Sequence, residues 1–265
     1  MSAETFQRKT KFIKREVYFY SREPKLKYVR IFSYGLDNRC MKILLGTIDS
    51  SVSDPKFTPT RTITFNYDGA SLLPASLSSV RTIHPNLTTN FYFKYDNHGR
   101  KVLDSVHVKN TAGESAYKTI RYEYHKGRVH STPVLNGFPI DHHPFDTLEL
   151  LQAGNIEKQV TRLFNGGTSR TFTRRFTYDQ SINPYNRLNI SNSLYFENQS
   201  LGLGYSVSLE TTYLGVTTNN TSSINSDGHV IRFRYVYDQD NYPVKKEIIL
   251  PGEVDGYHVT YLEYQ

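Results

Sequence analysis

Residues 91–100 read Phe-Tyr-Phe-Lys-Tyr-Asp-Asn-His-Gly-Arg, and this short stretch carries both halves of a β-hairpin signal. Phe91, Phe93 and Tyr95 are two residues apart, so on an extended chain they project from one face. This alternation is typical of a half-buried antiparallel strand. The aspartate after Tyr95 can accept a backbone amide two residues on, and Gly99 can adopt the left-handed conformation that closes a turn. The stretch therefore predicts a strand that ends in a tight turn.

The same pattern of alternating aromatics, a tyrosine and a turn recurs along the chain. Further copies lie at 31–34, 65–69, 120–127, 176–179, 233–241 and 259–264. The last tyrosines of successive copies are about 28 residues apart or about twice that, so each double gap should hide a degenerate unit. The strand-like stretches 156–164 and 205–214 lie where those units would fall. About nine units of two strands each predict roughly 16 strands.

The predicted fold is all-β: a long antiparallel meander of repeated β-hairpins, curled into an open or closed barrel-like sheet with a shared dry interior. Second strands of the hairpins are expected at 101–109 and 244–250, after the turns. The less repetitive stretches 131–146 and 183–200 are expected to be long surface connections, and 219–228 a polar loop. One domain is expected over residues 1–265, with 1–24 as a peripheral N-terminal segment.

Composition fits an aromatic core in a chain that is hydrophilic on average. Hydrophobic residues make up 37% of the chain, and 21 Tyr and 15 Phe supply much of that share. A membrane-spanning barrel would carry a largely aliphatic lipid face with aromatics at its two edges. Here the aromatics run along the strands and the mean hydropathy is −0.54, so we expect no membrane-spanning structure.

Charge gives little information about a partner. The net charge of +7 comes from basic residues scattered along the chain, without a run of five or more. A basic surface is necessary for nucleic-acid binding, but no recognised nucleic-acid-binding motif accompanies the charge. Nucleic acid is therefore not expected as a partner.

The ends of the chain and its cysteine leave the cellular compartment open. The first residues lack the apolar segment of a signal peptide, so the protein is expected to be cytoplasmic or to have had an export signal trimmed. Cys40 is the single cysteine and excludes an internal disulfide. It has no evident base beside it in the sequence, so we interpret it as a small buried residue rather than a nucleophile.

Two sets of motifs resemble known families. The Tyr-Asp-x-x-Gly-Arg step at 95–100 resembles the YD repeats of secreted bacterial Rhs-type shells. The stretches 65–74 and 153–156, and Tyr178-Asp179 with 183–185, resemble an uncharacterised family of exported lipoprotein-like domains from Bacteroidetes, described as having a porin-like fold. This second resemblance would cover most of residues 25–265.

The resemblance implies an extracytoplasmic protein, periplasmic or at the cell surface, with a lipid anchor in its full-length form. Two features depart from the family: the chain has no signal peptide, and Cys40 lies well inside the fold, where it cannot be the cysteine of a lipobox. Removal during cloning would explain both. The resemblance supplies no functional residue.

The most enzyme-like cluster is the run 141–146, in which Asp141, His142, His143 and Asp146 bring two imidazoles and two carboxylates together. With His130 or His125 they could bind zinc or a similar ion. Adjacent histidines on an extended chain point in opposite directions, however, so both can rarely serve one metal. We therefore interpret the run as a proline-punctuated connection, and predict neither a metal nor a cofactor.

The other polar residues that recur have a structural interpretation. Asp68, Asp96, Asp179 and Asp238 each follow a tyrosine and are predicted to form turns rather than a pair of catalytic carboxylates. Neither a nucleophile elbow nor a phosphate-binding loop is present in the sequence.

The sequence favours a non-enzymatic scaffold or binding module at the cell envelope, holding a lipid-like or glycan ligand or an envelope protein. Two alternatives stay open: a hydrolase acting on polysaccharide, and a structural adhesion or shell protein. The sequence does not predict which residues bind a ligand.

Overall fold

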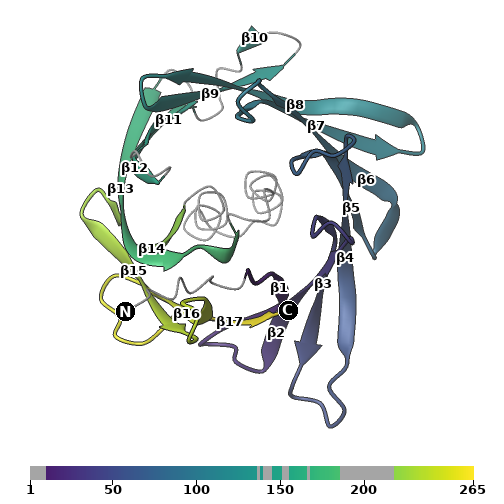
Figure 1. Cartoon of the computed structure of the whole chain (residues 1–265), viewed down its shortest axis with the longest axis vertical. Helices are drawn as coiled ribbons and strands as arrows, with labels where there is room; N and C mark the ends of the chain where they lie inside the picture. Colours follow the sequence, from purple (N-terminus) through teal and green to yellow (C-terminus); the bar gives the residue numbers. More distant parts are fainter. Residues whose placement is uncertain (1–9, 136–137, 140–144, 151–154, 166–167, 186–217) are drawn as a thin grey trace, which may run out of the picture.

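The computed structural model of the 265-residue chain describes residues 10–135, 138–139, 145–150, 155–165, 168–185 and 218–265. They form one antiparallel sheet (Figure 1). The strands from the first half of the chain are β1 (Ile13–Tyr20), β2 (Leu26–Tyr34), β3 (Cys40–Asp49), β4 (Phe57–Tyr67), β5 (Pro74–Arg81), β6 (His84–Tyr95), β7 (Lys101–Asn110), β8 (Gly113–His125) and β9 (Arg128–Leu135). The others are β10 (Phe138–Pro139), β11 (Phe145–Leu150), β12 (Ile156–Asn165), β13 (Thr168–Ile182), β14 (Asn219–Ser226), β15 (His229–Tyr237), β16 (Pro243–Ile249) and β17 (His258–Tyr264).

The sheet curls into a barrel-like ring. Most strands pair with their neighbours in the chain, and β1 pairs with β17 as well as with β2. On the other side of the ring, β9 pairs with β11 as well as with β8, and the two-residue β10 lies beside β9. Followed from strand to strand, the pairings return to β1, and Figure 1 shows the strands arranged around a centre.

The turns after the aromatic strands share one geometry. In the turns 35–39, 96–100 and 238–242, the amide of the first residue donates to the carbonyl of the fifth at 2.9 Å. The fourth residue has a positive φ in each: 61° for Asn38, 72° for Gly99 and 63° for Asn241. Glycine and asparagine tolerate this left-handed conformation better than other residues, which explains their place in the repeat.

A tyrosine at the end of most repeats ties two strands together. Six tyrosine hydroxyls donate to the carbonyl of the first residue of the preceding strand: Tyr34 to Ile13 (2.8 Å), Tyr67 to Cys40 (2.8 Å), Tyr95 to Pro74 (2.9 Å), Tyr124 to Lys101 (2.8 Å), Tyr178 to Ile156 (2.7 Å) and Tyr264 to Pro243 (2.7 Å). We call this edge of the ring the tyrosine rim. We call the opposite edge, with the turns 21–25, 50–56, 82–83, 111–112 and 250–257, the far rim.

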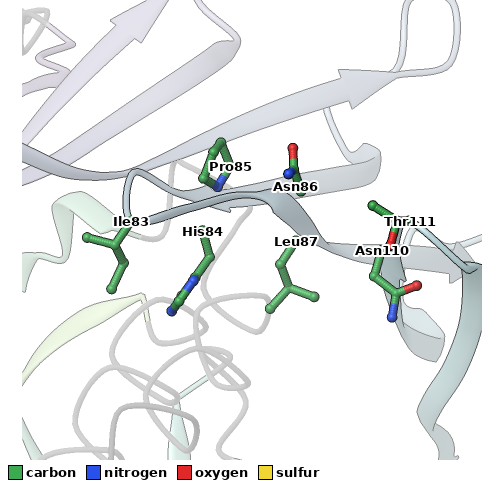
Figure 2. A pocket seen from close by; sticks show the side chains of 7 residues that line it. All are labelled: Ile83, His84, Pro85, Asn86, Leu87, Asn110 and Thr111. Atoms are coloured by element: carbon green, nitrogen blue, oxygen red, sulfur yellow. The ribbon is translucent and has the colours of Figure 1, made fainter.

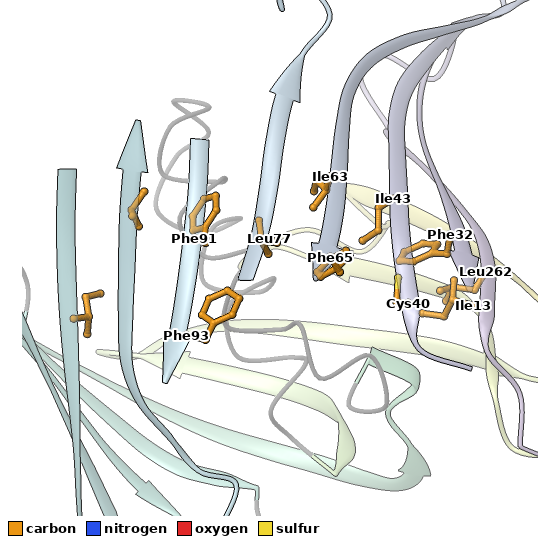
Figure 3. Close-up of a cluster of buried hydrophobic side chains, with 12 residues drawn as sticks. Ile13, Phe32, Cys40, Ile43, Ile63, Phe65, Leu77, Phe91, Phe93 and Leu262 are labelled. Carbon is orange, nitrogen blue, oxygen red and sulfur yellow. The ribbon is translucent and has the colours of Figure 1, made fainter. Parts of the chain in front are cut away.

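The core lies on the face of the sheet that carries the alternating aromatic residues of the repeats. We call this face the inner wall. Phe91 and Phe93 are buried, whereas Tyr92 between them is 40% exposed on the outer wall. One cluster of twelve buried residues runs from β1 across β2 to β8 and includes Leu262 of β17 (Figure 3). A smaller cluster joins Ile156 and Phe176 to residues of β14, β15 and β16. Burial of these apolar surfaces is the main stabilisation available to such a sheet.

The structure confirms the predicted fold class: the described residues form an antiparallel meander with sixteen longer strands and the short β10. The expected second strands are β7 and β16, and the expected degenerate unit at 156–164 is β12. The other expected unit, 205–214, lies outside the described residues.

Three expectations about irregular segments were wrong. Residues 131–146 are not one surface connection, since 131–135 belong to β9, 138–139 form β10 and 145–146 begin β11. A proline removes one amide donor but keeps its carbonyl, and Pro133 takes part in the pairing of β9 with β8. Residues 13–20 of the supposedly peripheral segment 1–24 form β1, which is paired on both sides. Of the expected connection 183–200, only 183–185 are described, and Asn183 is buried.

The third error is the polar loop expected at 219–228, because 219–226 form β14. Its buried polar residues make hydrogen bonds to neighbouring strands. The side-chain amide of Asn220 donates to the backbone carbonyl of Ile182 at 3.0 Å. The Thr221 carbonyl accepts the Tyr235 hydroxyl at 2.9 Å. These bonds come from neighbouring strands, so the alternation of apolar residues that predicts a strand is not required here.

Within the described residues, the structure contains no helix that is long and apolar enough to cross a membrane.

Candidate ligand-binding site on the inner wall

The candidate metal cluster of the sequence lies largely outside the described residues. Asp141, His142 and His143 lie outside the described residues, and the backbone of β11 pairs Asp146 with Ser131 of β9. The two candidate helpers lie in neighbouring strands, His125 at the end of β8 and His130 in β9. The described residues contain no group of three or more His, Cys, Asp or Glu side chains placed to hold a metal ion. The interpretation of the run as a structural connection stays a prediction for 141–144, whereas residues 145–146 belong to β11.

The repeated aspartates act in turns, as predicted for Asp96 and Asp238. One carboxylate oxygen of Asp96 accepts the amides of His98 and Arg100, both at 2.9 Å. Asp238 accepts the amides of residues 240 and 242 in the same way, and Lys11 contacts its other oxygen at 2.7 Å. Burial alone would raise the pKa of Asp96, but its hydrogen bonds with Arg100 lower the pKa below its usual range.

Asp179 has a further structural role. It accepts the amide of Ser181 at 2.9 Å and a close hydrogen bond from the Tyr237 hydroxyl. That contact links β13 to β15 across β14, and burial is the first cause of the raised pKa of Tyr237. Asp179 is therefore a hydrogen-bonded structural carboxylate.

Cys40 is 3% exposed, as expected for a small core residue. Burial raises the pKa of its thiol to about 12, so the sulfur is protonated at neutral pH. This state is that of a packing residue rather than of an activated nucleophile.

Charged residues occupy several inner-wall positions at which the two-residue alternation predicts apolar residues. Glu16 of β1 is 3% exposed and accepts a hydrogen bond from Arg30 of β2 at 3.1 Å, directly across the strand pair. Burial acts to lower the pKa of Arg30, but the Glu16 carboxylate outweighs it and the pKa is raised overall. The Arg30 guanidinium also lies 5.3 Å from the centre of the Tyr18 ring, so the pair is held by a cation–π contact as well.

Two buried polar atoms on β17 have no hydrogen-bond partner within the described part of the chain. They are Nδ1 of His258 and Oγ1 of Thr260, in residues that are 6% and 0% exposed. Burial, together with Lys246 and Arg30, lowers the pKa of His258 to about 3, so the imidazole is neutral at pH 7. An unsatisfied buried polar atom costs about 1–3 kcal/mol and commonly marks a place for water or a ligand.

The most unusual pair is formed by two arginines. Arg61 of β4 and Arg81 of β5 are directly opposite each other, in the same inner-wall phase as the apolar pair Phe65 and Leu77. Arg61 is only 6% exposed. Like charges directly opposite each other across two strands are destabilising.

A second buried ion pair shows how the wall neutralises charge elsewhere. The Lys101 Nζ lies 3.1 Å from Oδ1 of Asp104, and the other oxygen of this carboxylate accepts a hydrogen bond from the Tyr122 hydroxyl at 2.7 Å. Burial lowers the pKa of Lys101 and raises that of Asp104, and their mutual attraction opposes both shifts. The charges of Lys101 and Asp104 therefore balance each other within the wall.

The sequence contained a signal for these residues. In Arg61-Thr62-Ile63-Thr64-Phe65 the arginine is in phase with the buried Ile63 and Phe65, so it belongs to the face that should be apolar. The strand register was needed to show that a second arginine is its partner.

Two solved structures from Bacteroides share this fold. A porin-like protein from Bacteroides uniformis superimposes with a TM-score of 0.58 at 9% identity, covering 96% of this chain and 98% of its own. A porin-like protein from Bacteroides vulgatus gives a TM-score of 0.56 at 13% identity, with coverage of 97% and 99%. At such low identity the likeness defines the class of protein by fold alone: a porin-like antiparallel ring. No family of known proteins matches the sequence, and no curated protein does.

Proposed function

We propose that this chain is a non-enzymatic binding module of the bacterial cell envelope that holds its ligand against the inner wall. The observation that carries the proposal is two buried polar atoms on the inner wall, Nδ1 of His258 and Oγ1 of Thr260, which have no hydrogen-bond partner among the described residues. Such atoms are costly unless water or a ligand satisfies them, so a binding site on this wall accounts for them.

The location in the envelope is supported by the porin-like neighbours and by the resemblance to exported Bacteroidetes domains. Kinship with YD-repeat proteins and a lipid anchor on the full-length protein stay predictions.

We further propose that the outer wall faces water rather than lipid. Ion pairs lie on it: Arg15 of β1 contacts Glu263 of β17 at 3.4 Å, and Lys245 contacts Glu247 of the same strand, β16, at 2.8 Å. Arg234 also makes a close ion pair with Glu247. Charged side chains on a lipid-facing wall would be strongly destabilising near the bilayer centre. The inner wall carries the aromatic residues, so binding is expected inside the ring.

A non-enzymatic role is supported by the structural use of the candidate catalytic groups. The carboxylates of Asp96, Asp179 and Asp238 are engaged in turns and strand contacts, and the Cys40 thiol is protonated and buried.

The proposal can be tested by native mass spectrometry of the protein purified gently from its own host. We expect a population heavier than the polypeptide by the mass of a small molecule, which denaturation releases. A mass equal to that of the polypeptide alone would count against a ligand-holding module. Turnover of chromogenic glycosides or esters would instead favour the hydrolase alternative.

A further inference from the structure

A pocket opens at the far rim where the pairing of β6 with β7 stops. Its volume is about 360 Å³, at the lower end of the range for small-molecule sites (Figure 2). It lies between the first residues of β6 and the turn that joins β7 to β8. The residues that line it are Ile83, His84, Pro85, Asn86, Leu87, Asn110 and Thr111. All of them are exposed, so the pocket is open to solvent.

The strand register explains why a pocket forms here. On β6, Thr88 is the last residue before the rim that pairs with both β5 and β7. The next pair on the β5 side begins at His84, so residues 85–87 have no pairing partner on either neighbouring strand of the described sheet. Continued pairing would set Leu87 opposite Asn110, and the pocket lies between these two residues instead. The pocket therefore occupies the place where the ladder of β6 and β7 would continue.

An extended stretch that leaves its ladder can pair with another chain. Backbone amide and carbonyl groups need hydrogen-bond partners, which outside a ladder come from water or from a ligand. Pro85 carries no amide hydrogen, so the backbone donors of the stretch are those of Asn86 and Leu87. An extended peptide presents donors and acceptors at the spacing of a strand, and peptides commonly bind to exposed strand backbone in this way.

The side chains of the pocket favour an uncharged, apolar partner. Ile83 is 76% exposed and Leu87 is 40% exposed, and Figure 2 shows both, with His84, projecting to the same side of the chain. None of the lining residues is a lysine, an arginine or a carboxylate. A charged side chain would therefore find no counter-charge in the lining, whereas an aliphatic side chain would bury apolar surface there.

We infer that the pocket binds an extended, uncharged segment of a partner polypeptide, which pairs with the backbone of 85–87 and places an aliphatic side chain against Ile83 and Leu87. The inference goes beyond the proposed function, because this site lies at the far rim and shares no residue with the inner-wall atoms of His258 and Thr260. A failure of the peptide site therefore leaves the inner-wall proposal standing, and the reverse also holds.

Three capped pentapeptides separate backbone pairing from apolar contact. Acetyl-Thr-Val-Thr-Val-Thr-amide is uncharged and suited to an extended conformation, because β-branched residues favour strands. A second peptide has the same side chains but N-methyl groups on its central residues, which removes backbone donors, and a third has aspartate in place of each valine. Titrated into the whole protein, the first should bind saturably and shift the backbone resonances of Asn86 and Leu87 in proton–nitrogen NMR spectra. The other two should each bind at least about tenfold more weakly.

Matched variants locate the site. Leu87→Asn should weaken binding of the valine peptide about tenfold, because an apolar contact is lost. Ile83→Asn should weaken the binding in the same direction. Val254→Asn, at an 83% exposed residue of another far-rim turn, is the control and should leave the affinity unchanged. Circular dichroism of each variant confirms that the ring is intact before binding is compared.

Four outcomes would overturn the inference. The first is the absence of saturable binding of the valine peptide. The second is equal binding of its N-methylated form, since the pocket would then hold apolar groups without strand pairing. The third is an unchanged affinity in both Leu87→Asn and Ile83→Asn. The last is a self-association of the protein that Leu87→Asn abolishes, which would assign the pocket to a second copy of this chain.

Discussion

The two rims of the ring are built from the same strands but differ in construction. At the tyrosine rim, one hydroxyl-to-carbonyl bond recurs six times, and three five-residue turns share one backbone geometry. At the far rim, the turns range from the two residues 82–83 to the eight residues 250–257, and Ile83 and Val254 are exposed there. The repeat therefore shapes the tyrosine rim, whereas the far rim tolerates turns of different lengths.

Alkaline pH should have the largest effect, because it acts on the whole tyrosine rim at once. Burial raises the pKa of the rim tyrosines above the usual value of about 10, in Tyr124 to about 12. Since the folded pKa exceeds the unfolded one, the stabilisation is present below about pH 10 and is lost as the pH rises further. Absorbance at 295 nm should show a late group of ionising tyrosines, and their ionisation should coincide with loss of the far-ultraviolet circular dichroism. Ionisation of every tyrosine near pH 10 with the fold intact would contradict this.

A core substitution on the inner wall, between the two rims, should have the next largest effect on stability. Phe91→Ala removes a ring that is 2% exposed in the main core cluster, and should lower the free energy of unfolding by about 3–5 kcal/mol. Tyr92→Ala, at the adjacent outer-wall residue, is the matched control and should cost about 1 kcal/mol or less. Urea unfolding measures both. Similar losses would show that the assignment of inner and outer walls is wrong.

Removal of a single rim bond should have a smaller effect. Tyr95→Phe keeps the ring and deletes the hydroxyl that donates to the Pro74 carbonyl, so we expect a loss of about 1 kcal/mol in the free energy of unfolding. Tyr92→Phe deletes an exposed hydroxyl at 3.2 Å from Glu114 and should change stability by less than half of that. If the two variants unfold at the same urea concentration, the tyrosine rim is not a source of stability.

A far-rim substitution should have the smallest effect on stability. Ile83→Asn changes a solvent-exposed side chain in a two-residue turn, and should alter the free energy of unfolding by about 0.5 kcal/mol or less. The thermal midpoint should therefore be close to that of the parent protein. A loss as large as that of Tyr95→Phe would remove the contrast between the two rims.

Local patterns predicted the regular part of this fold well. The alternation around Phe91 predicts a half-buried strand from side-chain period alone, and Gly99 predicts a turn because its positive φ is easily reached. The strand β14 was missed because Asn220 and Thr221 are buried with partners from other strands, which no local pattern records. The interpretation of the run from Asp141 as a connection rather than a metal site could not be compared at Asp141, His142 and His143, because these residues lie outside the described part of the chain.

By itself, the sequence determined the antiparallel hairpins, their repeat and the face that each aromatic side chain takes, because these depend on residues that are close together in the chain. The folded chain was needed to show that β1 joins β17, that Arg61 lies opposite Arg81, and that Ile83 lines a pocket with Asn110. These contacts depend on strand register and on the curl of the whole sheet. Both are set by packing among distant residues rather than by local conformational preference.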